Sequence, residues 1–413
     1  MTLVFNNYRK IDLRYWSLLL LAFFPVLPYA LISIITALFL FICIYSFFGQ
    51  VKKLSPNKEQ LKEFILLAGF YLIICFSVFY SQDIGTAIKV VGRMVPLLLF
   101  PLAIIFFSRN YRLNNGKKKK ILNAFVFSSF LLLIYVFVLG FMSINDFHSH
   151  SIRNKLLETS YLDLHSTYIS IYFSSAIFIL IIAYNTKKNF WNLFLILLFL
   201  IGLLLIFSRG VVFSIIIEFV LFYLIRNKRK FWQKILVLLV FIFSMSLTIY
   251  QIPFLRYRIT EIYQYGFQST ENNKRLSSTS MRLAVYSCAM DIIAKNPLTG
   301  LGVGDLQTEL QLCYQSLNSP DFSVKNLNTH NFYFYMLGTA GIFGLISFII
   351  SLGTILKRAW KSENLLFLCV FALVSLVLLT ENILSRSYGL TFFCFFLTIL
   401  YLSDVKNKST TNY

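Results

Sequence analysis

The sequence predicts an all-α integral membrane protein with about twelve transmembrane helices and one long extracytoplasmic loop that contains helices. The first observation is composition: 58% of residues are hydrophobic, 13% are charged, and the mean hydropathy is +0.72. A soluble domain carries about a quarter charged residues, so this chain belongs to the membrane class. The second and third observations are long apolar runs along the whole chain and basic residues clustered between them. One membrane domain can account for nearly all 413 residues.

The apolar runs define the individual helices, because a spanning helix needs about 20 apolar residues. Pro25 and Pro28 split the first long run into a short helix and a longer one. No repeat of about 20–50 residues is visible, which excludes a solenoid. The predicted spans lie near residues 16–28, 30–48, 63–80, 89–107, 121–141, 166–184, 190–207, 211–225, 235–250, 331–356, 365–380 and 388–402. The corresponding regions are nine spans within 1–250, a loop at 251–329, three spans within 330–403, and a tail at 404–413.

The distribution of lysine and arginine orients these spans. With a cytoplasmic N-terminus, alternate loops are rich in basic residues and together hold 25 of the 38, including the run Lys117 to Lys120. This is the pattern of the positive-inside rule, and adding or removing one helix would break it. We therefore expect both termini in the cytoplasm and the loop 251–329 in the periplasm or outside the cell. The net charge of +21 is explained by these loops, and no nucleic-acid-binding motif is visible, so the expected partner is membrane lipid.

The six cysteines form no Cys-x-x-Cys pair and no metal-ligand spacing. Four of them lie within apolar runs, where cysteine acts as a small buried hydrophobe. Cys288 and Cys313 share the long loop and can pair if that loop is outside the cytoplasm, but the sequence leaves the pairing open. The first apolar run is too long for a cleavable signal peptide.

The long loop contains the stretch RLAVYSCAMDIIAKNPLTGLGVGDL. Its helical periodicity stops at Asn296–Pro297. The glycines from Gly300 to Gly304 superficially suggest a nucleotide-binding loop, but they follow a helix and a proline turn rather than a strand. We expect instead that these glycines permit tight turns that pack the loop on the membrane domain.

Several charged residues occupy positions for which the hydrophobic pattern gives no reason. Ionisable groups at membrane depth are costly and usually face a cavity or a partner. Glu218, in the middle of a span, can pair with a basic residue inside the bundle. The others are Lys89, Arg93, Arg209, Glu381 and Arg386.

One histidine shares the outer side with a group of cations, namely Lys89, Arg93, Arg209, Arg282 and Arg386. His330 can be an ordinary polar residue where a helix begins. Several cations around one histidine nevertheless indicate a site for a phosphorylated ligand, because guanidinium groups bind phosphate oxygens bidentately. Only Asp83 and Glu381 are acidic in the short outer turns, without an Asp-x-Asp motif, so we expect a metal-independent site.

Four segments together resemble the bacterial O-antigen ligase superfamily, which includes O-antigen ligases, some O-antigen polymerases and bacterial O-oligosaccharyltransferases. The histidine motif of the family is similar to His330-Asn331, nine residues, then Gly341-Ile342-Phe343-Gly344. Its arginine, helix and Pro-Leu-x-Gly-x-Gly pattern resembles Arg282 followed by residues 296–302. Its Ser-Arg-Gly turn and His-x-Thr-Tyr segment look like residues 208–210 and 165–168.

The resemblance implies a GT-C-type glycosyltransferase of the bacterial inner membrane with a periplasmic active site and no cofactor. The donor would be a glycan on undecaprenyl diphosphate, and the acceptor lipid A–core, another glycan or a protein. The leaving diphosphate needs charge stabilisation by arginine, and the acceptor hydroxyl needs orientation or deprotonation by a neutral imidazole. Attack opposite the diphosphate would invert the anomeric centre.

These roles are expected of particular residues. His330, Arg282 and Arg209 are the candidate catalytic residues. The helix N-terminus and nearby arginines are expected to keep the His330 imidazole neutral. Gly338, Gly341 and Gly344 are expected along one side of its helix, where they let neighbouring helices approach. The candidate substrate-binding residues are Lys89, Arg93, His165, Asn331 and Arg386.

One position departs from the pattern of some ligases, which is Arg-x-x-x-Leu in the loop: Arg282 is followed at that spacing by Tyr286. Arg256 and Arg258 are therefore rivals to Arg282, although they can also be interfacial anchors. We favour a ligase over a polymerase because the histidine motif is complete, and a protein O-oligosaccharyltransferase stays an alternative. A transporter or flippase of lipid-linked glycans is an alternative of another class, but such proteins commonly show repeats and broken mid-membrane helices.

Overall fold

The computed structural model describes residues 12–48, 57–108, 111–142, 164–206, 208–226, 278–317 and 327–403. Within these ranges every element is helical, apart from an isolated bridge between Leu113 and Ser403. The prediction of an all-α protein is therefore confirmed. The span expected at 235–250 and the rival arginines Arg256 and Arg258 lie outside the described residues.

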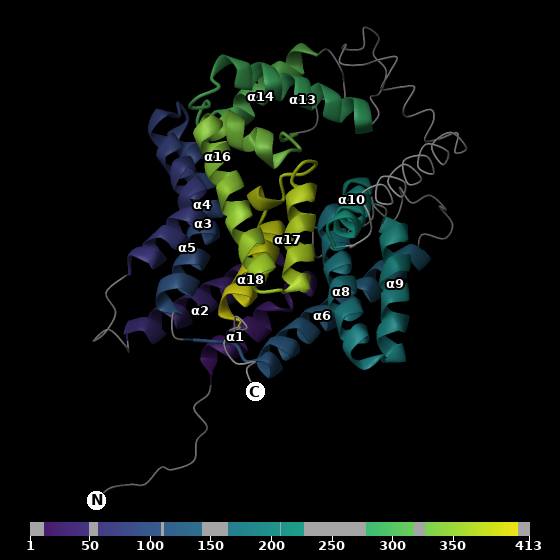
Figure 1. Cartoon of the computed structure of the whole chain (residues 1–413). Coiled ribbons are helices and arrows are strands. Elements are labelled where there is room, and N and C mark those ends of the chain that lie inside the picture. The colour runs from purple at the N-terminus through teal and green to yellow at the C-terminus, as the bar shows by residue number, and fades with distance from the viewer. Residues whose placement is uncertain are drawn as a thin grey trace, which may run out of the picture.

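The described helices follow the apolar runs in chain order (Figure 1). The first half of the chain contains α1 (Leu13–Leu21), η1 (Phe24–Val26), α2 (Tyr29–Phe48), α3 (Lys58–Phe76), η3 (Ser77–Tyr80), α4 (Ile84–Met94), α5 (Pro96–Leu102), η4 (Ala103–Phe107), α6 (Asn115–Met142), α8 (Ser166–Lys187) and α9 (Phe190–Ile206). The second half contains α10 (Arg209–Arg226), α13 (Ser278–Lys295), α14 (Leu306–Ser316), α16 (Phe332–Lys361), α17 (Leu365–Val377), η5 (Ile383–Ser385) and α18 (Ser387–Leu402).

Six helical segments in the described part of the chain are long and apolar enough to cross a membrane. They are Tyr29–Ser46, Lys58–Tyr80, Ile84–Phe107, Asn115–Leu139, Ser166–Thr186 and Phe332–Lys361. Four shorter apolar helices accompany them, at Leu13–Val26, Phe190–Ile206, Leu365–Val377 and Ser387–Leu402. The chain is thus a multi-pass membrane protein, whereas the count of twelve spans stays a prediction.

Prolines and a helix cap set the boundaries of two of the predicted spans. The first run is divided as expected, with Pro25 in η1 between α1 and α2. The fourth predicted span starts earlier than 89, because the Asp83 side chain accepts a hydrogen bond from Thr86 N (2.8 Å) and caps α4. Pro96 then begins a separate helix, since proline suits the first turn of a helix.

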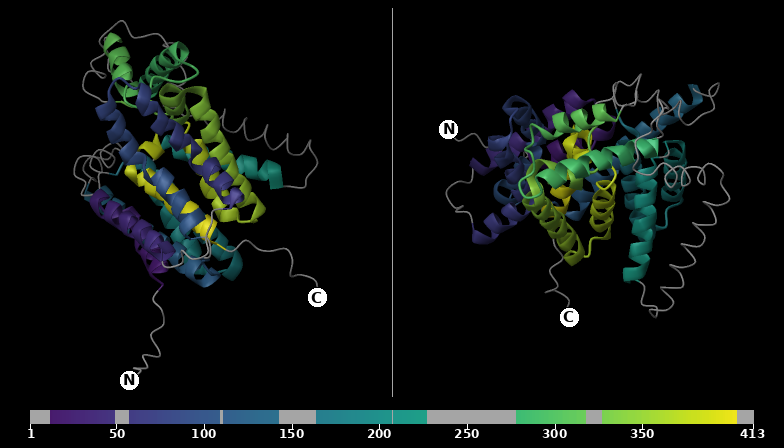
Figure 2. Two further views of the ribbon diagram at one scale, coloured as in Figure 1. Left: turned by 90° about the vertical axis from the view of Figure 1, so that its left-hand side faces the viewer. Right: turned by 90° about the horizontal axis from the view of Figure 1, so that it is seen from above.

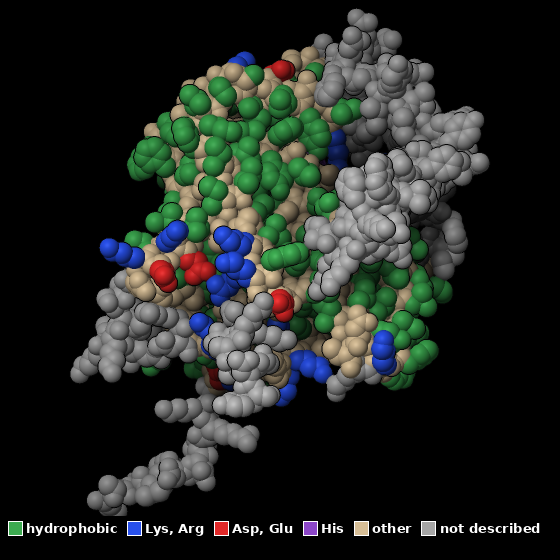
Figure 3. Space-filling model, in the orientation of Figure 1, with side chains coloured by type: hydrophobic (Ala, Val, Ile, Leu, Met, Phe, Trp, Pro, Cys, Tyr) green, Lys and Arg blue, Asp and Glu red, His purple; other side chains and the backbone are tan. Residues whose placement is uncertain are grey.

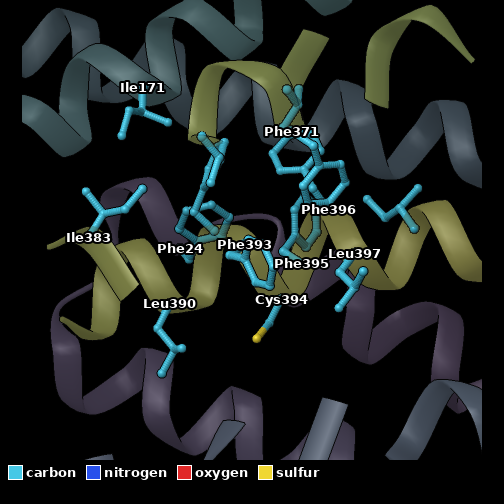
Figure 4. Packing of buried hydrophobic residues seen from close by; sticks show 14 of the residues in the cluster. Phe24, Ile171, Phe371, Ile383, Leu390, Phe393, Cys394, Phe395, Phe396 and Leu397 are labelled. Carbon is cyan, nitrogen blue, oxygen red and sulfur yellow. The ribbon is translucent and has the colours of Figure 1, made fainter. Parts of the chain in front are cut away.

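The short helix α18 lies at the centre of the bundle although it is not among the longest apolar helices. Every residue from Tyr388 to Leu402 is buried, as expected for a helix that is apolar on all sides. Figure 4 shows its phenylalanines packed around Phe24 of η1. The Phe24 ring lies 5.5 Å from that of Phe395 and 5.2 Å from that of Tyr172, which joins α18 to η1 and α8.

The two ends of the bundle differ in composition. Helices α13 and α14 cover one end, which we call the loop end, and both described chain termini lie at the other (Figures 1 and 2). Hydrophobic side chains cover the face between them, and lysine and arginine gather toward the second end (Figure 3). We call this second end the basic end; it includes the starts of α3 and α6 and the ends of α8 and α16. Helix α16 runs between the two, from Phe332 to Lys361.

Candidate functional site

A disulfide and a small apolar core hold the helices of the loop end together. Cys288 of α13 is bonded to Cys313 of α14, so the pairing that the sequence left open is present. Val285, Leu310 and Tyr314 are buried beside it in a cluster separate from the main core. The two loop helices therefore form one packed unit.

The segment between α13 and α14 contacts helix α16 at Gly341. Gly341 has φ 63° and ψ −162°, a conformation essentially restricted to glycine, and it interrupts the helix. The backbone N–H of Ile342 donates to Pro297 O (3.0 Å), and Leu301 N donates to Gly338 O (2.8 Å). The interruption thus leaves backbone groups that the loop satisfies. Residues 297–302 fill a break in α16.

Gly338, Gly341 and Gly344 of α16 consequently do not make the contact between membrane helices that the sequence predicted. A Cβ at Gly341 would clash with the carbonyl oxygen of Leu298, and one at Gly338 would meet Leu306 at 2.6 Å. A Cβ at Gly344 would meet Ala340 of the same helix. Gly338 and Gly341 admit the loop rather than another membrane helix.

The glycine run of the loop also packs on η3 and α4, as the sequence predicted. Gly300 and Gly302 adopt positive φ values of 71° and 101°, and Val303 N donates to Ser77 Oγ (3.1 Å). The Asp305 carboxylate accepts hydrogen bonds from the backbone N–H groups of Gln82 (2.7 Å) and Asp83 (2.9 Å). The loop end is thereby fixed to the membrane helices on two sides.

Three charged or titratable side chains meet beneath this loop. One carboxylate oxygen of Glu381 forms an ion pair with Arg282 Nη2, and the other lies 3.1 Å from His330 Nδ1. The Glu381 side chain is only 12% exposed. Burial raises the pKa of Glu381, but the hydrogen bond from His330 and the electrostatic attraction of Arg282 and His165 outweigh it and hold this pKa below its usual value. Glu381 is therefore an ionised carboxylate that joins α13 to the start of α16.

The backbone of His330 is held in an unusual conformation. Its φ is 44°, in the left-handed region that is costly for a residue with a Cβ. Its N–H donates to Asn328 Oδ1 (2.9 Å), and its carbonyl accepts from the Tyr286 hydroxyl (3.3 Å). Tyr286, the residue that departs from the family pattern, thus fixes the backbone of the histidine and packs its ring edge-on to Phe334.

Asn331 begins helix α16 as its N-cap. Its Oδ1 accepts hydrogen bonds from Tyr333 N (2.9 Å) and Phe334 N (3.2 Å). This contact explains why an asparagine follows the histidine, because asparagine is a strong N-cap. Its expected role in substrate binding stays a prediction.

A cavity of about 770 Å³ opens beside His330 and Glu381. Arg93, His165 and Arg386 also line it, together with residues from the start of α2. A second cavity of about 430 Å³ extends beneath α14. Both cavities share Arg93, Asn328, Asn382 and Arg386 in their walls.

The other predicted cations take different places. Arg209 begins α10, and the next residue, Gly210, packs against Thr380, the neighbour of Glu381. Lys89 is exposed on α4 one turn before Arg93 and is absent from the residues that line either cavity. The structure therefore brings His330, Arg93, His165 and Arg386 to one cavity, with Arg282 behind Glu381.

Sequence reasoning left two residues out of the candidate site, Glu381 and Tyr286. Glu381 is the acidic residue of the last outer turn, at a depth where a charge needs a partner, and this was its available signal. Tyr286 had only its departure from the family pattern. Glu218 shows the opposite case: it is buried, and the expected basic partner is not found among the described residues, where the Cys369 thiol is its polar neighbour.

The helices and the cavity define a class: a multi-pass membrane protein with a partly buried histidine–carboxylate–arginine group beside a cation-lined cavity. Residues 193–349 match the family model Wzy_C, described as O-antigen ligase. The match confirms the resemblance of the sequence to the O-antigen ligase superfamily. It extends from α9 to the middle of α16 and includes Arg209, Arg282, His330 and Gly341. No curated protein matches the chain.

Proposed function

We propose that this protein is an O-antigen ligase-type glycosyltransferase that moves a glycan from undecaprenyl diphosphate to lipid A–core or a similar acceptor. The family indicates the coarser activity, that of a membrane enzyme of the ligase and polymerase group. The observation that carries the finer proposal is the contact of Glu381 with both Arg282 and His330 at the edge of a cavity whose wall includes Arg93 and Arg386.

Arg93 and Arg386 would hold the diphosphate of the donor. They come from α4 and from the start of α18, and they line both cavities. A guanidinium binds phosphate oxygens through a planar pair of N–H groups, and preorganised cations stabilise the charge that develops on the leaving diphosphate. Arg282 and Arg209, expected from the sequence to share this task, would act from the loop and from α10. No metal ion is needed in this scheme.

His330 would activate the acceptor hydroxyl. An ionised carboxylate can only accept hydrogen bonds, so Glu381 fixes the proton of a neutral imidazole on Nδ1. Nε2 is then the nitrogen with a free lone pair, able to orient the hydroxyl and take its proton as the glycosidic bond forms. Attack from the side opposite the diphosphate would give inversion.

The position of the larger cavity suits a lipid-linked donor. Pro28, Tyr29 and Ala30 form part of its wall at the start of α2. Further along α2, Ile34 (62%) and Phe41 (63%) are exposed and apolar. An isoprenoid chain can lie along this helix while its diphosphate reaches the arginines.

The transporter alternative receives less support from the same region. Transporters place broken helices around a substrate site near the membrane midplane. Here the break in α16 at Gly341 is filled by residues 297–302 of the loop. A break that is closed by the protein's own backbone serves loop docking rather than passage.

Deletion of the gene followed by glycolipid analysis tests the proposed activity and separates it from polymerisation. Loss of a ligase leaves full-length polymer on undecaprenyl diphosphate. Loss of a polymerase leaves single repeat units on lipid A–core, and this outcome would replace the proposal by its alternative. Unchanged lipid A–core glycans would contradict both.

The proposal also requires the loop end to face the periplasm, with both termini in the cytoplasm. The disulfide in the loop supports this orientation, because disulfides persist outside the reducing cytoplasm. In a variant lacking the four free cysteines, Asp291→Cys in α13 should react with an impermeant thiol reagent in intact spheroplasts, and Lys361→Cys at the end of α16 should not. The reverse pattern would place the site on the wrong side of the membrane.

A further inference from the structure

A cavity at the basic end lies far from the proposed active site and has no part in it. It measures about 630 Å³ and lies between the start of α6, the α8–α9 turn and the start of α17. Lys118 and Lys119 line it together with four asparagines, and no carboxylate is among the described residues of its wall. The remaining lining residues are mostly apolar, namely Leu122, Ile179, Ile182, Ala183 and Leu366, with Thr186 at the rim.

This wall has two chemically different parts. The two ammonium groups and the amides at positions 115, 123, 189 and 192 offer hydrogen-bond donors to an anion. The aliphatic side chains offer a surface for an apolar group. A ligand that matches both parts is amphipathic and carries a negative head, and a phosphate diester attached to a diacylglycerol has this chemistry.

The surroundings of the cavity fit a lipid better than a soluble anion. The cavity lies where predicted membrane spans meet their basic loops, and Trp191 at the start of α9 is 68% exposed, as is typical of aromatic residues at the membrane interface. Beyond it, Leu193 (47%), Leu197 (56%) and Leu200 (45%) of α9 are exposed. These residues provide a surface along which acyl chains can lie while the headgroup occupies the cavity.

We propose that this cavity binds the headgroup of an anionic phospholipid of the inner leaflet, such as phosphatidylglycerol. Basic pockets between transmembrane helices on the cytoplasmic side are suited to anionic lipid headgroups. Lys118 lies with its ammonium group 5.1 Å from the centre of the Phe367 ring, which directs it toward α17 rather than along the exposed surface. The lysine run of α6 would thus do more than orient the chain, because two of its members form a lipid site. The site is independent of the proposed glycan transfer.

The test is native mass spectrometry of the purified full-length protein after exchange into nanodiscs that contain phosphatidylglycerol and phosphatidylcholine. The double variant Lys118→Gln/Lys119→Gln keeps most of each side-chain stem and removes both charges. The matched control is Lys120→Gln/Lys361→Gln, which removes two exposed charges of the same end that do not line the cavity. The wild-type protein and the control should retain phosphatidylglycerol, and the cavity variant should retain it on the order of tenfold less.

A second variant guards against loss of folding. Asn123→Asp places a carboxylate at an exposed position of the wall, where folding tolerates it, and should also lower phosphatidylglycerol retention. Equal losses in the cavity variant and the control would mean general surface attraction and would overturn the proposal. Equal retention of phosphatidylglycerol and phosphatidylcholine would overturn it as well. Displacement of bound lipid by millimolar glycerol 3-phosphate would identify a soluble phosphate ligand instead.

Discussion

The two ends of this protein use positive charge in different ways. At the basic end most lysines and arginines are exposed, and their ion pairs are peripheral: Arg358 pairs with Glu63 (2.8 Å) and lies over the Tyr401 ring, while Lys117 pairs with Asp12. At the loop end, by contrast, Arg282 and His330 converge on the largely buried carboxylate of Glu381. The net charge of +21 therefore includes basic residues that orient the chain in the membrane and basic residues of the candidate site. Burial and convergence, rather than number, distinguish the candidate site.

Removing the Glu381 carboxylate should have the largest effect on glycan transfer, whereas removing a carboxylate at the basic end should have none. Glu381→Gln leaves the partly buried Arg282 without its charged partner, which costs about 1–3 kcal/mol. It also removes the acceptor that orients His330, so we expect glycan transfer by the purified enzyme to fall about a hundredfold or more. Glu59→Gln, in the exposed first turn of α3, is the matched control at the basic end and should transfer normally. Equal rates for both variants would remove Glu381 from the proposed mechanism.

Two glycines of helix α16, Gly341 near the loop end and Gly353 toward the basic end, should respond differently to replacement by alanine. Gly341→Ala should lower the thermal stability of the protein in detergent, because positive φ costs about 1–3 kcal/mol and the new Cβ clashes with the Leu298 carbonyl. Gly353→Ala, in the same helix toward the basic end, meets no atom within 4 Å and should be neutral or stabilising by about 0.5–1 kcal/mol. Equal melting temperatures for the two alanine variants would mean that docking of the loop does not depend on the break in α16.

Arginine-to-lysine exchanges should affect glycan transfer at the loop end but not at the basic end. Arg282→Lys and Arg209→Lys keep the charge but lose the planar fork, so transfer should fall by roughly tenfold at either position while protein levels stay normal. Arg358→Lys at the basic end should leave transfer unchanged, because Arg358 pairs with Glu63 and lies over the Tyr401 ring, away from the proposed active site. Full activity of both site variants would move diphosphate recognition entirely to Arg93 and Arg386.

The smallest effect concerns pH. Because the pKa of Glu381 lies below its ordinary value of 4.5 in the folded protein, its ionised contacts stabilise the fold above that value. This contribution is lost as pH falls through the lowered pKa. The difference in melting temperature between wild type and Glu381→Gln should therefore be constant near neutral pH and shrink below about pH 4. A difference that grows as pH falls below about 4 would contradict the ionised state of Glu381.

Much of the fold could be predicted because apolar runs and proline positions act locally. The division of the first run at Pro25 and the packing of the glycines at 300–304 follow from such local rules. The break at Gly341 could not be predicted, since a Gly-x-x-Gly step also fits a continuous helix and only the docked loop distinguishes the two. The contact between Arg282 and Glu381 joins residues 99 positions apart, and nothing in the local pattern indicates it. The family motifs located His330 but not the carboxylate that orients it.

A transfer assay on the purified protein decides whether His330 activates the acceptor while the arginines hold the donor. Purified wild-type protein and His330→Ala are each given a glycan on undecaprenyl diphosphate and lipid A–core, and both donor binding and release of undecaprenyl diphosphate are measured. We predict that both proteins bind the donor with similar affinity and that only the wild type transfers the glycan. Near-normal transfer by His330→Ala would contradict the account and leave His330 as a polar residue at the start of a membrane helix.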